Sequence, residues 1–197
     1  MPARGESGAH KLAWLQPLGL GCCVCGSVGG GLVGFLFFVG VFHGTDSSCM
    51  IEEDLLFGIS NEQKQDKGWV CCDNERFAEP SGWWRSSELE AMLQRLPAGG
   101  NVTFYDASRR LPLYRAPVGR SIDTFLSESR SHGWPSFREA EVIWENIEMH
   151  GNEVKSKCGT HLGHDLPDGR GTRHCINLLC VAGRPEPSAA ATTTPGA

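Results

Sequence analysis

The second half of the sequence restricts the fold most, because short apolar or alternating runs follow one another there with turn-forming residues between them. These runs cover residues 102–105, 141–147, 153–157 and 174–182, and glycine, proline, asparagine and aspartate divide them. Alternation of apolar and polar residues over about four to eight positions is typical of a half-buried strand. Short strands separated by turns indicate antiparallel β structure rather than alternating strands and helices. The sequence therefore predicts a mainly β domain.

One short helix is predicted ahead of these strands, at residues 86–96. It has serine at its start, acidic side chains in its first turn, and an apolar face formed by Leu89, Met92, Leu93 and Leu96. Serine is a favoured N-cap, and acidic groups near a helix N-terminus stabilise it. Proline and glycine directly after this segment predict the end of the helix.

The segments on either side of this domain differ from it in composition. Residues 43–85 are predicted to be a linker that is polar and acidic at first and then becomes a loop with tryptophans on the domain surface. Residues 184–197 are rich in proline, serine, alanine and threonine, have little to bury, and are expected to be disordered. The folded domain is therefore assigned to residues 86–183.

A run without charged side chains extends from Leu12 to Phe42. Its residues 18–42 are long enough, as a helix, to cross about 30 Å of hydrocarbon. Basic residues precede the run and acidic residues follow it, which keeps residues 1–17 in the cytosol. We therefore expect a single-pass membrane anchor at 18–42, with the domain in a lumen or outside the cell. A cleaved signal that yields a secreted domain and an organelle-targeting peptide are the alternatives.

Two other features bear on compartment and partners. Asn101-Val102-Thr103 is an N-glycosylation sequon, which agrees with a luminal or extracellular domain. The net charge is −5, and lysine and arginine are scattered among acidic residues. A nucleic-acid partner is therefore not expected, because such proteins present a basic face.

The sequence contains nine cysteines, so at least one is unpaired under any disulfide scheme. No two Cys-x-x-Cys pairs occur, which leaves too few ligands at metal spacing for a zinc site made of four thiolates. For any single cysteine, a place in the core as a small apolar side chain is the alternative to a chemical role.

Reactive side chains gather in three clusters, at residues 132–137, 158–169 and 173–177. His161 and His164 lie three residues apart on either side of a glycine and could donate protons or bind a metal as a pair. A structural or solvated role is the alternative for both. Cys175 lies close to Arg173, and a neighbouring cation lowers the pKa of a thiol. A cysteine in an apolar strand is otherwise a core residue.

The order and spacing of these clusters are more specific than any one of them. The motifs are Gly-Trp-Pro-Ser-Phe at 133–137, His-Leu-Gly-His at 161–164, Asp-Gly at 168–169 and Arg-x-Cys-Ile-Asn at 173–177. Together they closely resemble the B-type methionine sulfoxide reductases. The resemblance covers roughly residues 104–181, and it implies a fold of two antiparallel sheets with few helices.

The resemblance also implies an activity. It implies a thiol enzyme that reduces methionine-R-sulfoxide, peptide-bound or free, to methionine through a sulfenic acid on Cys175. Trp134 and Phe137 are implied to contact the substrate. The polar residues that hold water or the sulfoxide oxygen and position the thiolate are implied to be His161, His164, Arg173 and Asn177.

This sequence departs from the family pattern where many members hold a structural zinc with two Cys-x-x-Cys pairs. Asp106 and Arg109 stand in place of the first pair. Only Cys158 remains of the second pair, with Lys155 opposite. The resemblance is therefore to the zinc-free branch, and neither a metal nor another cofactor is expected.

A second departure concerns recycling, because His132 stands where the family usually has its resolving cysteine. The thiols that could resolve the sulfenic acid within the chain are Cys180, Cys158, Cys71 and Cys72. An external thiol reductant such as thioredoxin is the alternative.

The third departure is beside the nucleophile itself. The loop at 168–173 is shorter than is common in the family, and Leu178 replaces a small polar residue. These changes motivate an alternative function, a catalytically weakened or inactive membrane-tethered module that binds a partner.

Overall fold

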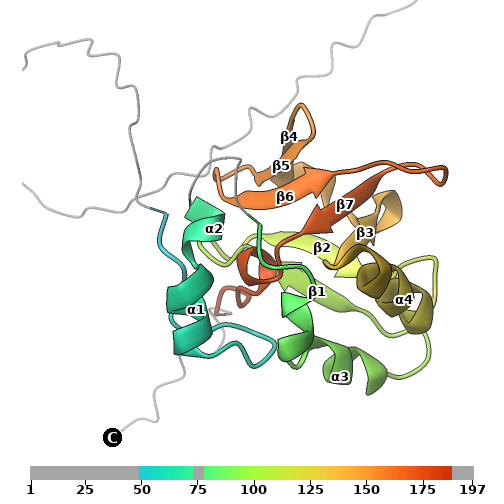
Figure 1. The fold of residues 1–197 in the computed structure, drawn as a ribbon, viewed down its shortest axis with the longest axis horizontal. Helices are drawn as coiled ribbons and strands as arrows, with labels where there is room; N and C mark the ends of the chain where they lie inside the picture. Colours follow the sequence, from blue (N-terminus) through green and yellow to red (C-terminus); the bar gives the residue numbers. More distant parts are fainter. Residues whose placement is uncertain (1–48, 73–77, 188–197) are drawn as a thin grey trace, which may run out of the picture. The chain divides into compact units, whose positions relative to one another are not determined.

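The computed structural model describes residues 49–72 and 78–187 (Figure 1). The predicted anchor at 18–42, the predicted cytosolic residues 1–17 and most of the predicted tail lie outside the described residues. Within the described ranges, none of the helices combines the length and the apolar character that crossing a membrane requires.

Two antiparallel sheets and a few short helices form the domain, which confirms the predicted mainly β class (Figure 1). One sheet pairs β1 (Val102–Tyr105) with β2 (Pro112–Ala116). The other has five strands in the order β3-β7-β6-β5-β4. The bounds of these five are β3 Ser136–Arg138, β4 Ile147–His150, β5 Glu153–Ser156, β6 His161–Asp165 and β7 Arg173–Ile176. Strand β7 therefore lies between β3 and β6, so side chains from three segments can meet around it.

The predicted strands agree with the structure in part. Those at 102–105 and 153–157 are confirmed as β1 and β5. The strand predicted at 174–182 ends early, because β7 stops at Ile176 and the 3-10 helix η4 (Leu179–Val181) follows. The strand predicted at 141–147 is wrong. The 3-10 helices η2 (Glu139–Glu141) and η3 (Trp144–Asn146) lie there, and the Glu141 carboxylate accepts the backbone N–H of Arg138 to close the first turn.

The predicted helix at 86–96 is confirmed in its central part as α3 (Leu89–Gln94), and the 3-10 helix η1 (Trp83–Ser86) precedes it. Three further helices were not predicted from the sequence: α1 (Asn61–Lys67), α2 (Trp69–Cys72) and α4 (Ile122–His132). Helix α4 begins after Ser121, whose hydroxyl accepts the backbone N–H of Thr124. It packs Phe125 and Leu126 into the core.

Gly133 ends α4 and turns the chain toward β3. Its φ angle is 91°, in the left-handed region, and a Cβ atom there would lie 2.0 Å from Ser81 Oγ. Only glycine meets both conditions without strain. The first motif of the sequence therefore begins with the residue that lets Trp134 follow the helix directly.

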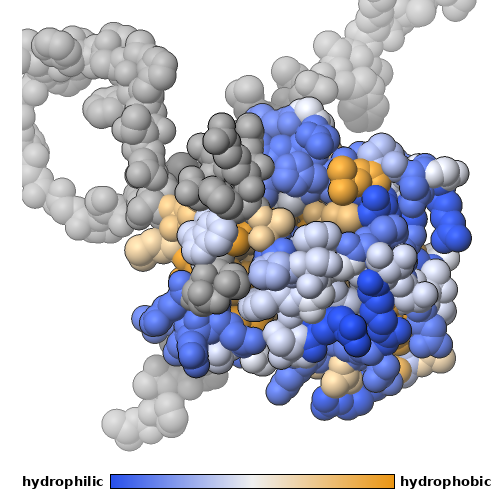
Figure 2. Space-filling model, viewed as in Figure 1, coloured by the Kyte–Doolittle hydropathy of each residue, from blue (hydrophilic) through white to orange (hydrophobic). Residues whose placement is uncertain are grey.

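The core is centred on aromatic side chains. The Phe137 ring lies 4.2 Å from Tyr114, 4.9 Å from Phe104 and 5.5 Å from Phe125, measured between ring centroids. All four are fully buried. On the face drawn in Figure 2 the surface over this core is mostly hydrophilic, and the hydrophobic residues there form separate patches.

The segment predicted as a linker differs from that expectation, because part of it belongs to the core. Leu55, Phe57 and Ile59 are buried, and the Phe57 ring lies 5.2 Å from that of Phe104. The expectation of surface tryptophans is met by Trp69, which is 43% exposed, but not by Trp84, which is 1% exposed. The apolar run Leu55-Leu56-Phe57 is too short to show a helical or alternating period, so this packing could not be predicted from it.

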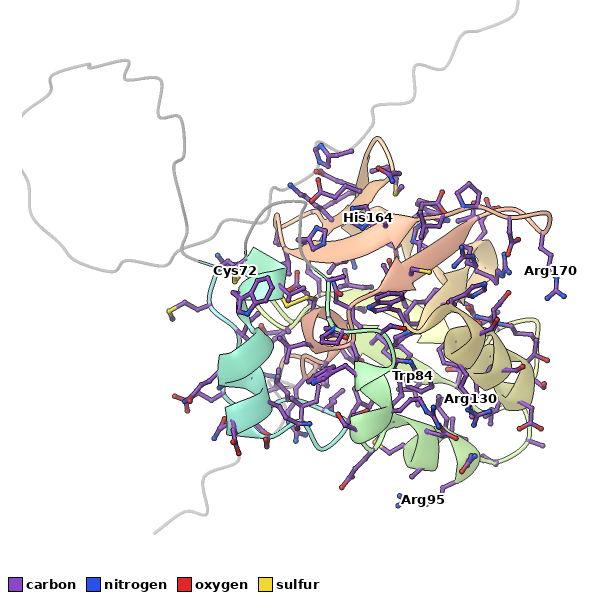
Figure 3. The ribbon with its side chains drawn as sticks, in the orientation of Figure 1. Cys72, Trp84, Arg95, Arg130, His164 and Arg170 are labelled. Atoms are coloured by element: carbon purple, nitrogen blue, oxygen red, sulfur yellow. A yellow bond between two sulfur atoms is a disulfide. The ribbon has the colours of Figure 1, made fainter. Side chains whose placement is uncertain are left out.

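Two disulfides hold the N-terminal segment, one within it and one between it and the rest of the domain. Cys49 is bonded to Cys72, and Cys71 is bonded to Cys180 across 109 residues of sequence. The second bond ties α2 to η4, and Figure 3 labels Cys72 at this end of α2. Cross-links of this kind typically contribute roughly 2–4 kcal/mol by restricting the unfolded chain.

Candidate active site

Strand pairing brings three of the predicted site residues to one face of the five-stranded sheet. Cys175 on β7 pairs directly with His164 on β6 and with Ser136 on β3. Directly paired residues point to the same face, and so does Arg173, which lies two positions before Cys175. The thiol is therefore flanked by an imidazole, a hydroxyl and a guanidinium. Figure 3 labels His164 in the middle of this sheet.

An irregularity in β6 adds His161 to the same face. In a regular strand, residues three apart point to opposite faces. Here His161 pairs with Lys155 and His164 pairs with Glu153, so β6 holds one extra residue opposite β5. Because Glu153 and Lys155 are two apart, their partners share a face, and the two imidazole rings lie 5.5 Å apart. The bulge brings together two histidines that sequence spacing alone would separate.

Gly163 allows β6 and β7 to approach closely beside the nucleophile. A Cβ atom on Gly163 would lie 2.1 Å from the carbonyl oxygen of Cys175. Any other residue would push the two strands apart. The glycine of the His-Leu-Gly-His motif therefore sets the distance between His164 and the thiol.

Cys175 carries a free thiol that is 8% exposed. Burial raises the pKa of the Cys175 thiol, and the Arg173 guanidinium and the Ser136 hydroxyl act in the opposite direction. Arg173 Nη1 donates a hydrogen bond to Cys175 Sγ at 2.6 Å, and Ser136 Oγ lies 3.9 Å from the same sulfur. Arg173 is therefore the group that most directly favours the thiolate.

A cavity of about 200 Å³ lies in front of this thiol. Trp134, Leu166 and Ala78 give it apolar walls, and its other lining residues are Gly163, His164, Cys175 and Asn177. Asn177 Nδ2 is buried and has no hydrogen-bond partner among the described residues. The cavity therefore combines an apolar wall, a nucleophile and an amide donor whose hydrogen-bonding capacity is not used.

His161 stands behind His164 and is oriented by a carboxylate. Its Nδ1 lies 2.8 Å from Glu153 Oε1, and Lys155 Nζ lies 3.2 Å from the same oxygen. Burial lowers the pKa of His161, although Glu153 acts against this. Burial would raise the pKa of Glu153, but its bonds to His161 and Lys155 lower it overall. The pair holds the His161 ring in one orientation, with Nε2 left unbonded among the described residues.

Comparisons with known proteins agree with this geometry. The chain is 30% identical to the mitochondrial methionine-R-sulfoxide reductase B2 of Danio rerio over 134 residues, which cover 56% of this chain and 74% of that protein. It is 41% identical over 95 residues to the peptide methionine sulfoxide reductase MsrB of Pseudomonas putida strain GB-1, covering 41% of this chain and 72% of that protein. The chain belongs to the MsrB family. No family model and no solved structure matches it.

The loop at 168–173, expected from the resemblance to be short for the family, is held firmly in this chain. Arg138 donates to both carboxylate oxygens of Asp168, at 2.9 and 2.8 Å, and Arg173 Nε lies 3.5 Å from Asp168 Oδ2. The Arg138 guanidinium holds the pKa of Asp168 well below its usual range. The shortened loop therefore still supports Arg173 beside the thiol. Figure 3 shows Arg170 of this loop pointing outward.

Phe137, expected from the MsrB resemblance to contact the substrate, lies elsewhere. It follows Ser136 on β3, so it points to the opposite face of the sheet and is fully buried in the aromatic core. It is not among the residues that line the cavity. The alternation of the strand makes Ser136, which was not predicted as a site residue, the one that faces Cys175.

The cysteines considered as resolving thiols are disulfide-bonded in this structure. Cys71 and Cys180 are bonded to each other, Cys72 is bonded to Cys49, and Cys158 is also in a disulfide. Among the described cysteines, Cys175 is the free thiol.

His132, at the family's resolving position, lies near the nucleophile without lining the cavity. Its Nδ1 lies 3.3 Å from Ser136 Oγ, which separates it from Cys175. Burial and the nearby Arg173 lower the pKa of His132. A larger cavity of about 680 Å³ lies beside α4 and includes His132, but Cys175 does not line it.

The residues at the positions where the resemblance places a structural zinc do not fit a zinc ion. Asp106 is fully buried, and its Oδ1 accepts the backbone N–H groups of Ser108 and Arg109 and the hydroxyl of Thr160 at 3.0 Å. Arginine cannot ligate zinc, and the remaining cysteine is in a disulfide. A hydrogen-bonded carboxylate thus joins the segment that holds Asp106 to the segment that holds Thr160.

Glu79 is a further buried residue, bonded to the cavity residues Trp134 and Asn177, that no motif in the sequence marked. It is 1% exposed, and burial raises the pKa of Glu79 to about 8, although the backbone N–H groups of Leu179 and Leu178 act against this. It precedes Pro80 in a stretch without periodicity, so its burial could not be predicted.

Proposed function

We propose that this protein reduces methionine-R-sulfoxide, peptide-bound or free, to methionine, with Cys175 as the nucleophile. The observation that carries the proposal is a free thiol, hydrogen-bonded by Arg173 at 2.6 Å, in a small cavity with Trp134 as an apolar wall. The names of the relatives describe reduction of methionine sulfoxide. Their length is covered only in part, so the activity is a proposal for this chain.

The first half-reaction transfers the sulfoxide oxygen to the protein. The Cys175 thiolate attacks the sulfoxide sulfur and forms an S–S bond, and the protonated oxygen leaves that sulfur as hydroxide. The hydroxide then attacks the Cys175 sulfur, the S–S bond breaks, and methionine leaves. Cys175 becomes a sulfenic acid, so the substrate sulfur gains the two electrons that the cysteine sulfur loses. The proton that the oxygen needs comes from the His161 and His164 pair, or from water that they hold.

The cavity suits the reacting group. Trp134 offers a flat apolar surface for the S-methyl group. Asn177 Nδ2 is in a position to donate to the sulfoxide oxygen. A stereogenic sulfur with its methyl group against Trp134 presents the oxygen to these donors in only one of its two epimers.

An external thiol completes the cycle in this proposal. A thiolate from a reductant of the thioredoxin type attacks the sulfenic sulfur, which releases water and leaves a mixed disulfide. A second thiol of the reductant then releases the Cys175 thiolate. The disulfides of Cys71, Cys72, Cys158 and Cys180 favour this route over an internal resolving cysteine. Neither zinc nor another cofactor takes part.

The full-length chain with dithiothreitol is expected to reduce the R epimer of a methionine sulfoxide peptide and to leave the S epimer unchanged. Methionine formation, followed by chromatography from each pure epimer, measures this directly. Equal turnover of both epimers would contradict the proposal. Turnover of neither, with Cys175 protected from alkylation, is the result that the alternative predicts, namely an inactive interaction module.

We further propose that the domain lies in a lumen or outside the cell, anchored through residues 18–42. Two disulfides among the described residues support an oxidising compartment. When the chain is expressed in a secretory cell, Asn101, which is exposed directly before β1, is expected to carry an N-linked glycan. The glycan is detected as slower migration of the protein on a denaturing gel, and treatment with a glycosidase removes this shift. Asn101→Gln should abolish the shift, and Thr103→Ser, which keeps the sequon, should retain it. An unshifted natural chain would contradict this placement.

A further inference from the structure

We propose that Glu79 is a positioning residue of the catalytic cavity, which holds Trp134 and Asn177 in their working geometry. The proposal rests on the function proposed above, because the cavity is the one in which the sulfoxide is expected to bind. Glu79 itself is not among the lining residues. It acts through Trp134 and Asn177, which do line the cavity.

The backbone of Glu79 bridges the two sides of the cavity. Trp134 Nε1 donates to the Glu79 carbonyl oxygen at 2.9 Å. The Glu79 N–H donates to Asn177 Oδ1, also at 2.9 Å. Trp134 lies between α4 and β3, and Asn177 follows β7, so one residue from a third segment joins two walls that are separate in sequence. The preceding residue, Ala78, lines the cavity itself.

The Glu79 carboxylate fixes this bridge to the turn after the nucleophile. Its Oε2 accepts the N–H of Leu178 at 2.8 Å, and its Oε1 accepts the N–H of Leu179 at 2.6 Å. These two bonds hold the start of η4, directly after Asn177. Both oxygens are therefore used as acceptors of backbone N–H groups, and these two bonds favour the ionised carboxylate against the rise in the pKa of Glu79 that burial causes. Above this pKa the carboxylate satisfies both bonds, whereas an amide can accept only one of them.

The hydrogen bond to Asn177 also fixes which way its amide points. With Oδ1 bonded to the Glu79 N–H, the amide nitrogen is the atom without a partner among the described residues. That orientation leaves a donor available for an oxygen atom. If the bridge moved, the amide could rotate and Trp134 could shift, and misplacement of such groups by about 1 Å costs up to about 100-fold in rate.

Glu141 offers a matched control, because it is an equally buried carboxylate with a structural role. It is 1% exposed, it is paired with Arg120 at 2.6 Å, and it accepts the backbone N–H of Val118. It does not line the cavity in front of Cys175. A variant at this position therefore reports the effect of losing a buried carboxylate without disturbing the bridge.

The test measures alkylation of Cys175 by iodoacetamide in the full chain, with the peptide that contains Cys175 quantified by mass spectrometry. Glu79→Gln replaces one acceptor oxygen with an NH₂ group that faces the backbone N–H of Leu178 or Leu179. Two donors cannot bond to each other, so residue 79 must move away from the start of η4. We expect the alkylation rate to rise by about tenfold, because the cavity opens more often. Glu141→Gln should leave it within about twofold. Rates are compared at about pH 9, above the pKa of about 8 of Glu79, and well below the thermal midpoint of each variant.

An unchanged alkylation rate in a folded Glu79→Gln protein, or an equal rise in Glu141→Gln, would overturn the proposal. If Glu79→Gln does not fold, Trp134 is replaced by benzothienylalanine, which keeps the shape of the ring and lacks its N–H. The rate should again rise, since the bond to the Glu79 carbonyl is lost, and an unchanged rate would overturn the proposal.

Activity measurements separate this inference from the proposed function. If the natural chain reduces the R epimer, Glu79→Gln should lower kcat/KM by about 10- to 100-fold, and Glu141→Gln should not. If the natural chain reduces neither epimer, the proposed function fails. The alkylation rates still decide whether Glu79 holds the cavity.

Discussion

Replacement of Cys175 by serine is expected to abolish reduction of methionine-R-sulfoxide, with a loss on the order of 10⁴-fold or more in kcat. A serine hydroxyl at this position stays protonated at neutral pH and cannot form the sulfenic acid on which the oxygen is carried away. The protein should remain folded, because the substitution changes one atom in a side chain that lines a cavity. Turnover of the R epimer and the thermal midpoint are measured on the same preparation.

The control for this prediction removes a disulfide and spares the nucleophile. Cys49→Ser with Cys72→Ser eliminates the bond between α2 and the start of the described chain, and it leaves Cys71–Cys180 in place. This double variant should retain turnover within a few-fold and lose some stability, in the range of about 2–4 kcal/mol for a cross-link. Residual activity in Cys175→Ser that matches the natural chain would mean that another thiol is the nucleophile.

The site could be predicted from the sequence as a set of residues, but its arrangement could not. The motifs named Cys175, Trp134, His164 and Asn177, and the structure brings these four together around one cavity. They could be identified from the sequence because they lie in short motifs of uncommon residue types. Ser136 was missed as a neighbour of the thiol, since its place depends on the register of β3 against β7.

The long-range partners of the site could not be predicted for a physical reason. Glu79 and Cys71 approach the residues around Asn177 from about 100 positions earlier in the chain, and Glu79 N–H to Asn177 Oδ1 spans 98 residues. Periodicity describes only neighbours within one element. The N-terminal segment was therefore interpreted as a linker, although two of its own residues, Leu55 and Phe57, are buried in the core.

The helix that leads into Trp134 was missed for a related reason. Residues 122–132 of α4 contain many serine and charged side chains, with only a few apolar ones such as Phe125 and Leu126. So few apolar residues give only a weak helical pattern in the sequence. The helix is stabilised mainly by its packing against the rest of the domain. The clearest local signals were its ends, Ser121 as N-cap and Gly133 as C-cap.

Replacement of Arg173 by methionine is expected to slow both turnover and Cys175 alkylation at pH 7 by about 10- to 100-fold. Burial already raises the pKa of the Cys175 thiol, and Arg173 lowers it through the hydrogen bond at 2.6 Å. Removing the guanidinium therefore raises this pKa further. Below the pKa, each unit of increase reduces the thiolate fraction tenfold, so the rate falls at neutral pH and recovers as the pH rises.

The pH profile distinguishes this effect from a general loss of structure. The alkaline shift should appear in the rate of Cys175 alkylation between pH 6 and about 10, a reaction that needs the thiolate and no substrate. Arg173→Lys, which keeps the positive charge, should restore part of the rate. Arg170→Met removes an arginine from the same loop whose side chain is 75% exposed, and its profile should match that of the natural chain. If Arg173→Met leaves the profile unshifted, the thiolate is favoured by another group, and Ser136 is the remaining neighbour hydrogen-bonded to the sulfur among the described residues.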